Sequence, residues 1–269
     1  MEMLHEFWAP RKMYKPCGMF TKEHLILLCI GISILSFLLI ISVKITIEKV
    51  DILTKILAIF LTFLEGVKIF FNFYWGYTKV RYWFPISFCS IFIYALWMSG
   101  FFKNKLKKMG DSFISGAAIV AGVAYLIFPS TSLTIYPMKH YLCIYSIVFH
   151  ILMIYMGVIY LRKKQMKLNL INFREFTIIY LVFFAVAITI NYLTNSNLML
   201  ISSPGNIPIK LIHDIYKFNS YIYTSLVFII YLIVPYWSTS FIVKIIKKIK
   251  NSRFLFDDKN ISELRKRFK

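Results

Sequence analysis

Residues 141–161, YLCIYSIVFHILMIYMGVIYL, form an unbroken apolar and aromatic run with a single histidine, His150, near its middle. A bilayer core about 30 Å thick requires about 20 such residues in a helix. Basic residues follow the run directly, at Arg162 and Lys163. The stretch therefore predicts a membrane-spanning helix that carries one imidazole inside the membrane.

The whole chain shares this composition. Of its 269 residues, 59% are hydrophobic and 18% are aromatic, against about 45–50% apolar residues in soluble domains. The net charge is +20, but the basic residues fall between long apolar runs, whereas nucleic-acid binders gather them on one water-facing surface. The composition excludes a soluble globular domain and predicts membrane lipids, and no nucleic acid, as partners.

Six further apolar segments match the length of a membrane span, so we predict an all-α fold, a polytopic transmembrane helical bundle of about seven spans. The six lie approximately over residues 25–43, 52–75, 83–102, 112–128, 176–193 and 218–241. No small-residue cleavage site follows the first, which we expect to remain as a helix. The predicted parts are an extracytoplasmic amino-terminal arm (1–23), a transmembrane helical domain (24–241) and a basic cytoplasmic tail (242–269).

The distribution of Lys and Arg predicts the orientation. These residues are more numerous in the odd-numbered loops and the tail than in the amino-terminal arm and the even-numbered loops. Because cytoplasmic loops carry the basic excess, we expect a multi-pass cell-membrane protein with its amino terminus outside and its carboxyl terminus in the cytoplasm. The tail is either an interfacial helix on anionic inner-leaflet lipid or a solvated charge run that ends the last span.

Few ionisable side chains fall inside the predicted spans. Each costs about 2.5–3.5 kcal/mol on insertion scales and is therefore a candidate functional residue. They are Glu65, Lys68 and His150, with Cys89 and Asn191 as weaker candidates. Helical rise places His150 roughly 13 Å and Cys89 roughly 10 Å from the same membrane face. Both lie on odd-numbered spans, which run in the same direction, so a Cys–His contact is geometrically permitted.

A Cys–His pair suits nucleophilic catalysis. A thiol in an apolar setting is inert unless a base takes its proton, and an imidazole can take that proton and return it to a leaving group. Glu65 lies at a depth similar to that of His150 and could orient the imidazole. The alternatives are that Cys89 only packs, that His150 only joins helices, and that Glu65 neutralises Lys68 at i,i+3. Cys143, on the same span as His150, is a rival nucleophile.

Polar residues also gather at the predicted outer ends of the spans. Asn191 and Asn195 close the sixth span, and Ser130 and Thr131 lie in the loop after the fourth. Together with Lys68, they are candidate substrate-binding residues that would contact a lipid headgroup. The alternative is that they are ordinary helix-end and turn residues.

The remaining patterns predict packing and no cofactor chemistry. The four cysteines lack paired motif spacing, so the sequence predicts neither a disulfide framework nor a metal site, and no soluble cofactor. Small residues on the fourth and fifth spans, including Gly122 and Gly157, predict a close approach of helix backbones.

Several motifs, taken in order, resemble one family. EGVK at 65–68, FPISFCS at 84–90, PSTSL at 129–133 and the mid-helix His150 are similar to the bacterial YwaF family. Those proteins are relatives of the eukaryotic transmembrane protein 164, an integral membrane acyltransferase of phospholipid remodelling. The resemblance extends from about Phe20 to the last span.

The resemblance carries expectations about individual residues. It implies that Cys89 accepts the acyl group, that His150 is its partner and that Glu65 matches the family's acidic position. The chain departs from the family pattern at Ser87, where many members have histidine, and at Ile151, where glycine is frequent. These departures leave the substrate open.

The leading hypothesis is an acyltransferase that moves an acyl chain from a phospholipid to a lysophospholipid-type acceptor. The acyl group would pass through a thioester on Cys89, with His150 as the base. One alternative is a membrane transporter or lipid-binding protein without catalysis, for which interrupted spans would be the sign. Another is a structural membrane subunit whose buried polar residues serve only assembly.

Overall fold

The structure, a computed structural model, describes the backbone of residues 2–267 and the side chains of residues 5–249. The described residues form helices and no strands, which confirms the all-α prediction. The helices are α1 (Glu2–Phe7), α2 (Lys22–Ile41), α3 (Ile47–Tyr74), α4 (Val80–Trp83), α5 (Ile91–Phe101), α6 (Asn104–Gly116), α7 (Ala118–Ile127), α8 (Tyr141–Lys163), α9 (Leu170–Thr194), α10 (Lys210–Phe218) and α11 (Ser220–Arg267).

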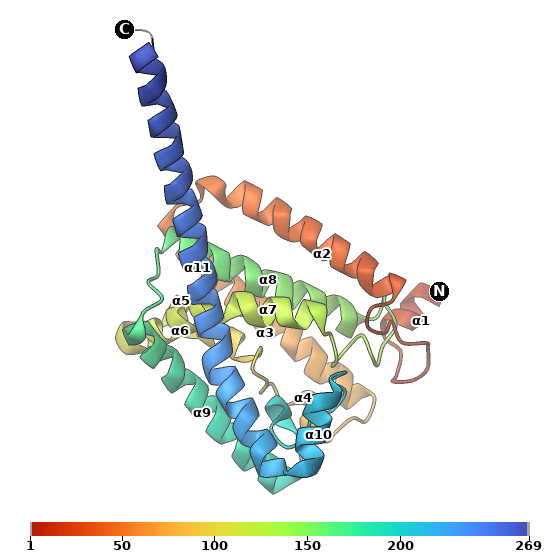
Figure 1. The fold of residues 1–269 in the computed structure, drawn as a ribbon. Coiled ribbons are helices and arrows are strands. Elements are labelled where there is room, and N and C mark those ends of the chain that lie inside the picture. The colour runs from red at the N-terminus through yellow and green to blue at the C-terminus, as the bar shows by residue number, and fades with distance from the viewer. Residues whose placement is uncertain (1, 268–269) are drawn as a thin grey trace.

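Helix α8, the predicted central span, lies at the centre of the bundle. It begins where the side chain of its cap residue, His140, accepts a hydrogen bond from the Leu142 amide, and it ends in a basic turn. The most apolar stretch of α8 is 72% buried, against 17% for α2. Helices α2, α3, α6 and α7 pack against α8, whereas α9 packs on α6, and α11 packs on α7 and α6 (Figure 1).

Six of the seven predicted segments are helical over most of their length, and the segment 83–102 is helical only in part. Five helices are long and apolar enough to cross a membrane alone: α2, α3, α8, α9 and the first part of α11. The predicted segment 112–128 falls on the end of α6 and on α7, a pair bent by 43° that is either a broken sixth span or a re-entrant loop. The predicted segment 83–102 contributes only α5, which is too short to cross.

The prediction of a continuous helix over 83–102 is therefore wrong, and Pro85 is the reason. The residue before a proline is driven out of the helical region, and Phe84 is extended, with φ −68° and ψ 124°. The Ser87 hydroxyl then accepts a hydrogen bond from the Ser90 amide at 3.0 Å, which stabilises a turn. Since the helix begins only at Ile91, the depth calculated for Cys89 from helical rise does not apply.

Glycines set the closest helix contacts. A Cβ on Gly122 of α7 would lie 2.6 Å from a side-chain carbon of Ile154 on α8. A Cβ on Gly157 of α8 would lie 2.7 Å from Ile119 on α7. The predicted packing role of small residues on these two segments is thus confirmed, and it holds α7 firmly against α8.

The amino-terminal arm folds onto the end of the bundle where α8 begins. The Cys17 amide donates to the Tyr136 carbonyl at 2.9 Å, and the His140 ring lies 3.1 Å from the Ala9 carbonyl. At the other end of the chain, α11 continues through residue 242 without a break. The predicted interfacial tail lies mostly outside the residues whose side chains are described.

Candidate functional site

His150 lies in the middle of α8 and is only 5% exposed. Its Nδ1 lies 2.6 Å from the carbonyl oxygen of Ser146, one turn earlier on the helix. Because a carbonyl only accepts hydrogen bonds, Nδ1 carries the proton and Nε2 of the neutral ring holds the lone pair. Nε2 is buried and has no hydrogen-bond partner among the described residues. The imidazole is therefore oriented as a base whose lone pair is free.

Tyr125 of α7 holds the plane of this imidazole. The two rings stack with centroids 3.6 Å apart and an interplanar angle of 4°. The Tyr125 hydroxyl lies 2.5 Å from Oγ of Ser132. The PSTSL loop singled out in the sequence thus reaches His150 through Tyr125.

Cys89 lies in the turn before α5 and remains partly exposed. Three residues later, Phe92 meets Phe149 of α8 with ring centroids 5.9 Å apart. Since Phe149 directly precedes His150, this contact brings the start of α5 to the part of α8 that carries the imidazole. The thiol does not hydrogen-bond to the ring, however, because Nε2 has no partner among the described residues.

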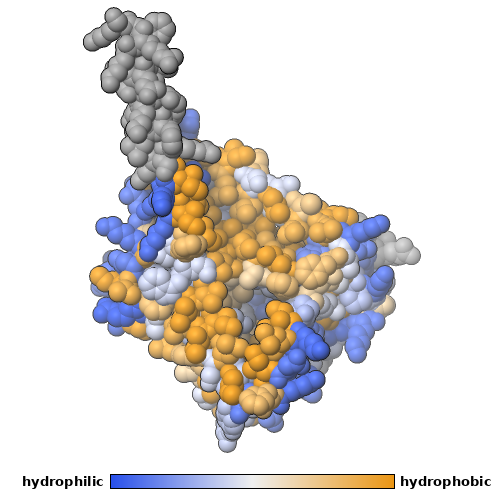
Figure 2. Space-filling view, in the orientation of Figure 1, coloured by the Kyte–Doolittle hydropathy of each residue, from blue (hydrophilic) through white to orange (hydrophobic). Residues whose placement is uncertain are grey.

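The surface beside α11 is apolar and hollowed. Figure 2 shows hydrophobic side chains over most of this side of the molecule and a hollow next to α11. Phe88, adjacent to Cys89, stacks on Tyr231 of α11 with centroids 4.8 Å apart. Cys89, Tyr125 and Tyr231 all keep partial exposure. An apolar recess with a few polar groups is the usual form of a small-ligand site.

Glu65 does not contact His150. Its carboxylate accepts a hydrogen bond from the Tyr145 hydroxyl and forms an ion pair with Lys68. The imidazole is oriented by the Ser146 carbonyl instead. The ion pair with Lys68 is the contact that the neutralisation alternative expects, and the described contacts do not join Glu65 to His150.

Asn191 supports a loop. Its side-chain oxygen accepts a hydrogen bond from the Leu198 amide at 2.7 Å, and its side-chain nitrogen donates to the Leu198 carbonyl at 3.1 Å. Both polar atoms of the amide group are therefore used to close the turn after α9. This is the arrangement that the helix-end alternative expects, and it leaves one N–H of the amide group without a hydrogen bond among the described residues.

Asn195 lies in a different setting. It ends α9 in a left-handed conformation, with φ 50° and ψ 39°, and its side chain is exposed. It lines a pocket of about 420 Å³ together with Lys79, Arg81 and Ser196. Ser130 is partly exposed and Thr131 is exposed, both in the loop after α7.

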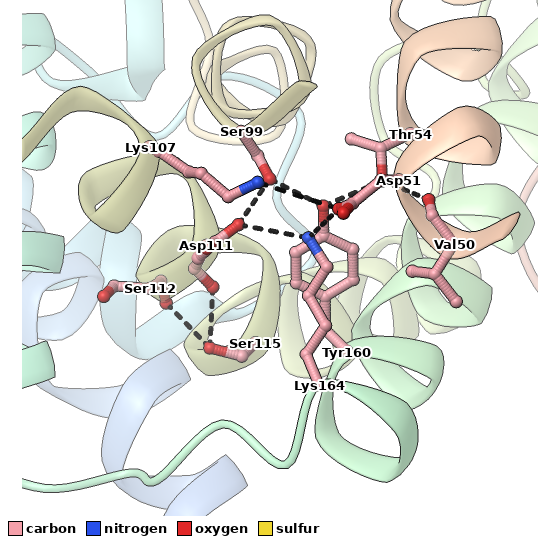
Figure 3. A network of polar contacts seen from close by, with 10 residues as sticks. All are labelled: Val50, Asp51, Thr54, Ser99, Lys107, Asp111, Ser112, Ser115, Tyr160 and Lys164. Carbon is pink, nitrogen blue, oxygen red and sulfur yellow. Dashed lines mark hydrogen bonds and ion pairs between the residues drawn. The ribbon is translucent and has the colours of Figure 1, made fainter. Parts of the chain in front are cut away.

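A second polar cluster, the Lys164 network, lies where α8 ends (Figure 3). Lys164 Nζ lies 2.8 Å from Asp51 of α3 and 3.6 Å from Asp111 of α6. Ser99 of α5 donates a hydrogen bond to Asp111. Tyr160 of α8 lies 2.7 Å from the Ser99 hydroxyl. Four helices thus meet through one set of paired polar groups.

Charge pairing keeps Lys164 protonated in this network. Burial works against its charge, but the oxygens of Tyr160, Asp111 and Asp51 outweigh burial and hold the pKa of Lys164 above its ordinary value. Asp111 and Lys164 lie just outside the apolar segments predicted at 112–128 and 141–161, so the apolar runs did not predict this network. The position of Asp51 near the start of a span was the available signal.

Within the part of the chain that the structure describes, no three His, Cys, Asp or Glu side chains gather in a way that could hold a metal ion. The helices and the buried histidine define a multi-pass helical membrane protein. The chain belongs to the TMEM164 family, whose sequence profile matches residues 19–237, from just before α2 to α11. No curated protein and no solved structure matches the chain.

Proposed function

We propose that the protein is an integral membrane acyltransferase that moves an acyl chain from a phospholipid to a lysophospholipid-type acceptor. The observation that carries the proposal is the buried, unpartnered Nε2 of His150. Leaving a buried acceptor without a hydrogen bond costs about 1–3 kcal/mol, and catalytic use is one of the accepted reasons for retaining such a group. Cys89, in the turn before α5, supplies the nucleophile in this proposal.

The reaction proceeds in two halves. Nε2 of His150 takes the proton of the Cys89 thiol, and the thiolate attacks the ester carbonyl carbon of the donor. The ester C–O bond breaks, the imidazolium gives its proton to the departing lysophospholipid oxygen, and a thioester remains on Cys89. In the second half, Nε2 takes the proton of the acceptor hydroxyl, whose oxygen attacks the thioester carbonyl carbon. The C–S bond breaks, the new ester leaves, and the imidazolium returns its proton to the Cys89 thiolate.

Other residues have supporting roles in this proposal. Tyr125 keeps the imidazole in plane by stacking on it. The turn at residues 86–90 lies outside the helices, so Cys89 can approach Nε2 without unwinding one. The pocket of Lys79, Arg81 and Asn195 offers two cations to a headgroup phosphate. Membership of the bacterial YwaF branch, with its phospholipid substrates, is part of the same proposal.

The test is turnover of a phospholipid with a labelled acyl chain by the purified protein in detergent. We expect Cys89→Ala and His150→Ala to lose transfer, and mass spectrometry to find an acyl adduct on Cys89 of the wild type. Cys29→Ala is the matched control because Cys29 is exposed on α2. Transfer by Cys89→Ala at the wild-type rate would contradict the nucleophile assignment and direct attention to Cys143.

A second candidate function is transport or lipid binding without catalysis. The observation that favours it is the pair of interrupted spans: α6 and α7 bend by 43° at their junction, and the chain is not helical between α4 and α5. Transporters place substrate sites at such interruptions. Saturable lipid binding with no thioester on Cys89 and no turnover would favour this candidate over acyl transfer.

The orientation is proposed on the basic residues. Lys44, Lys49 and Lys164 lie at the end of the bundle where α2 and α8 finish and α3 begins. The positive-inside rule places that end in the cytoplasm, with the amino-terminal arm outside. Labelling of single cysteines in intact cells, at residue 12 in the arm and at residue 105 in the first turn of α6, tests it. Reaction at residue 105 but not at residue 12 would reverse the orientation.

A further inference from the structure

A groove separates two consecutive helices, α2 and α3, above α8. Its volume is about 620 Å³, within the range of about 300–1,000 Å³ typical of small-ligand sites. The wall is apolar: Leu38 and Ile41 from α2, Ile52, Leu53, Ile56 and Leu57 from α3, and Leu152 from α8. The groove exists because α2 packs on α8 while α3 packs chiefly on α5.

One end of this groove is basic. Lys44 and Lys49 line it, and both side chains are exposed. Lys163 adds a third cation close by, since its Nζ donates to the Val43 carbonyl at 2.7 Å. No acidic side chain lines the groove. The groove therefore has an apolar wall and, at one end, basic side chains that can bind a negative charge.

Two hydroxyl groups lie inside, near the basic end. Ser42 Oγ and the Tyr155 hydroxyl are 2.5 Å apart, and both residues are buried. When two hydroxyls bond to each other, only one of the two protons is used, so the other can donate to a further acceptor. An ester carbonyl below a phosphate is such an acceptor.

The length of the groove favours an acyl chain as its occupant. From Lys49 to Leu57 the groove follows eight residues of α3, about 12 Å at 1.5 Å per residue. A free phosphate would gain nothing from this apolar length, whereas an acyl chain fills it. The most apolar stretch of α2 is only 17% buried by protein, so the groove is accessible to membrane lipid from its α2 side.

We propose that this groove binds one anionic phospholipid, with an acyl chain between α2 and α3 and the phosphate on Lys44 and Lys49. Basic pockets between spanning helices are suited to acidic headgroups. The site is separate from the His150 cluster: it uses the face of α8 that carries Leu152 and Tyr155, and it does not depend on acyl transfer. Its occupant ties α2 to the rest of the bundle.

The test measures phospholipid binding to the delipidated full-length protein by native mass spectrometry and by thermal melting. Phosphatidylglycerol is the probe and phosphatidylcholine the comparison lipid. We expect phosphatidylglycerol to bind more tightly and raise the melting temperature further, because a ligand of the folded state stabilises it. The double variant Lys44→Gln/Lys49→Gln should weaken phosphatidylglycerol binding about tenfold.

Two matched controls make the result specific. Lys105→Gln/Lys108→Gln removes the same charge from exposed positions outside the groove and should leave binding unchanged. Ile56→Trp, which fills the groove, should block both lipids, whereas Ile59→Trp at an exposed position on the same helix should not. Equal binding by the Lys44/Lys49 variant and its control, or equal affinity for the two lipids, would overturn the proposal.

Discussion

Helix α8 carries two polar clusters, which differ in whether their polar groups are paired. Towards its end, Tyr160 and Lys164 belong to a network in which ions and hydroxyls pair with one another. In its first half, His150 makes one hydrogen bond, to the Ser146 carbonyl, and keeps a buried nitrogen without a partner. The same helix thus leads to a network of ion pairs and hydroxyl contacts and carries a base whose free nitrogen has neither among the described residues.

This difference distinguishes a cluster that stabilises the fold from one that is available for a reaction. Removing one partner of a buried ion pair leaves a charge uncompensated and is strongly destabilising. An unpartnered buried acceptor is itself a cost to the folded state. The Lys164 network therefore has the features of a structural junction of four helices, whereas His150 has those of a group retained for a reaction.

The largest expected effect comes from His150→Phe, which keeps a ring against Tyr125 but removes the base. Acyl transfer should fall about 10²–10⁴-fold, the usual contribution of a general base, while the melting temperature stays near that of the wild type. Turnover and thermal melting of the same preparation measure both. Wild-type transfer, or unfolding as severe as that of a Lys164 variant, would remove the distinction between the clusters.

Lys164→Ala should have the opposite effect and lower the stability of the protein. It leaves Asp111 without its cation, and we expect a loss of about 3 kcal/mol in the free energy of unfolding. Lys167→Ala is the control, since Lys167 is exposed in the loop that follows. Denaturant titration in mixed micelles measures the loss. If the two alanine variants are equally stable, the network is not a structural junction.

Tyr160→Phe should have a smaller effect on the same network. The Tyr160 hydroxyl lies 2.7 Å from Ser99 and 2.9 Å from Thr54, both buried. Its removal leaves those hydroxyls to find other partners, at a cost of about 1–2 kcal/mol. Tyr221→Phe, on a ring that is 83% exposed, should cost almost nothing. A loss of transfer without a loss of stability would instead make Tyr160 part of the reaction.

The smallest effect concerns pH. Because the pKa of Lys164 is raised in the folded protein, its charge contributes stability that is fully present below the unfolded pKa of about 10.4. That contribution is lost as pH rises through the higher folded value. The stability difference between wild type and Lys164→Gln should stay constant from pH 7 to about 10 and narrow above it. Narrowing that begins near pH 8 would mean that Lys164 is not held by its carboxylates.

Single residues show how far the sequence could predict the site. His150 was identifiable because one imidazole stands in a long apolar run, and its bond to Ser146 follows the four-residue repeat of the helix. Glu65 and Asn191 were identified as unusual, but their partners, Tyr145 and Leu198, were not. The break at Pro85 was visible in the sequence, yet the apolar count alone extended the helix through it.

The sequence by itself determined the class of the protein, because the need to bury about 20 apolar residues per span is a local property of each segment. It also identified some of the polar residues inside those spans, His150 and Glu65 among them, but not Asp111 of α6. Only the tertiary structure decided which of them are paired, because pairing depends on distances between segments far apart in the chain. Gly122 and Gly157 bring α7 onto α8, so Tyr125 covers one face of His150 while Nε2 stays without a partner.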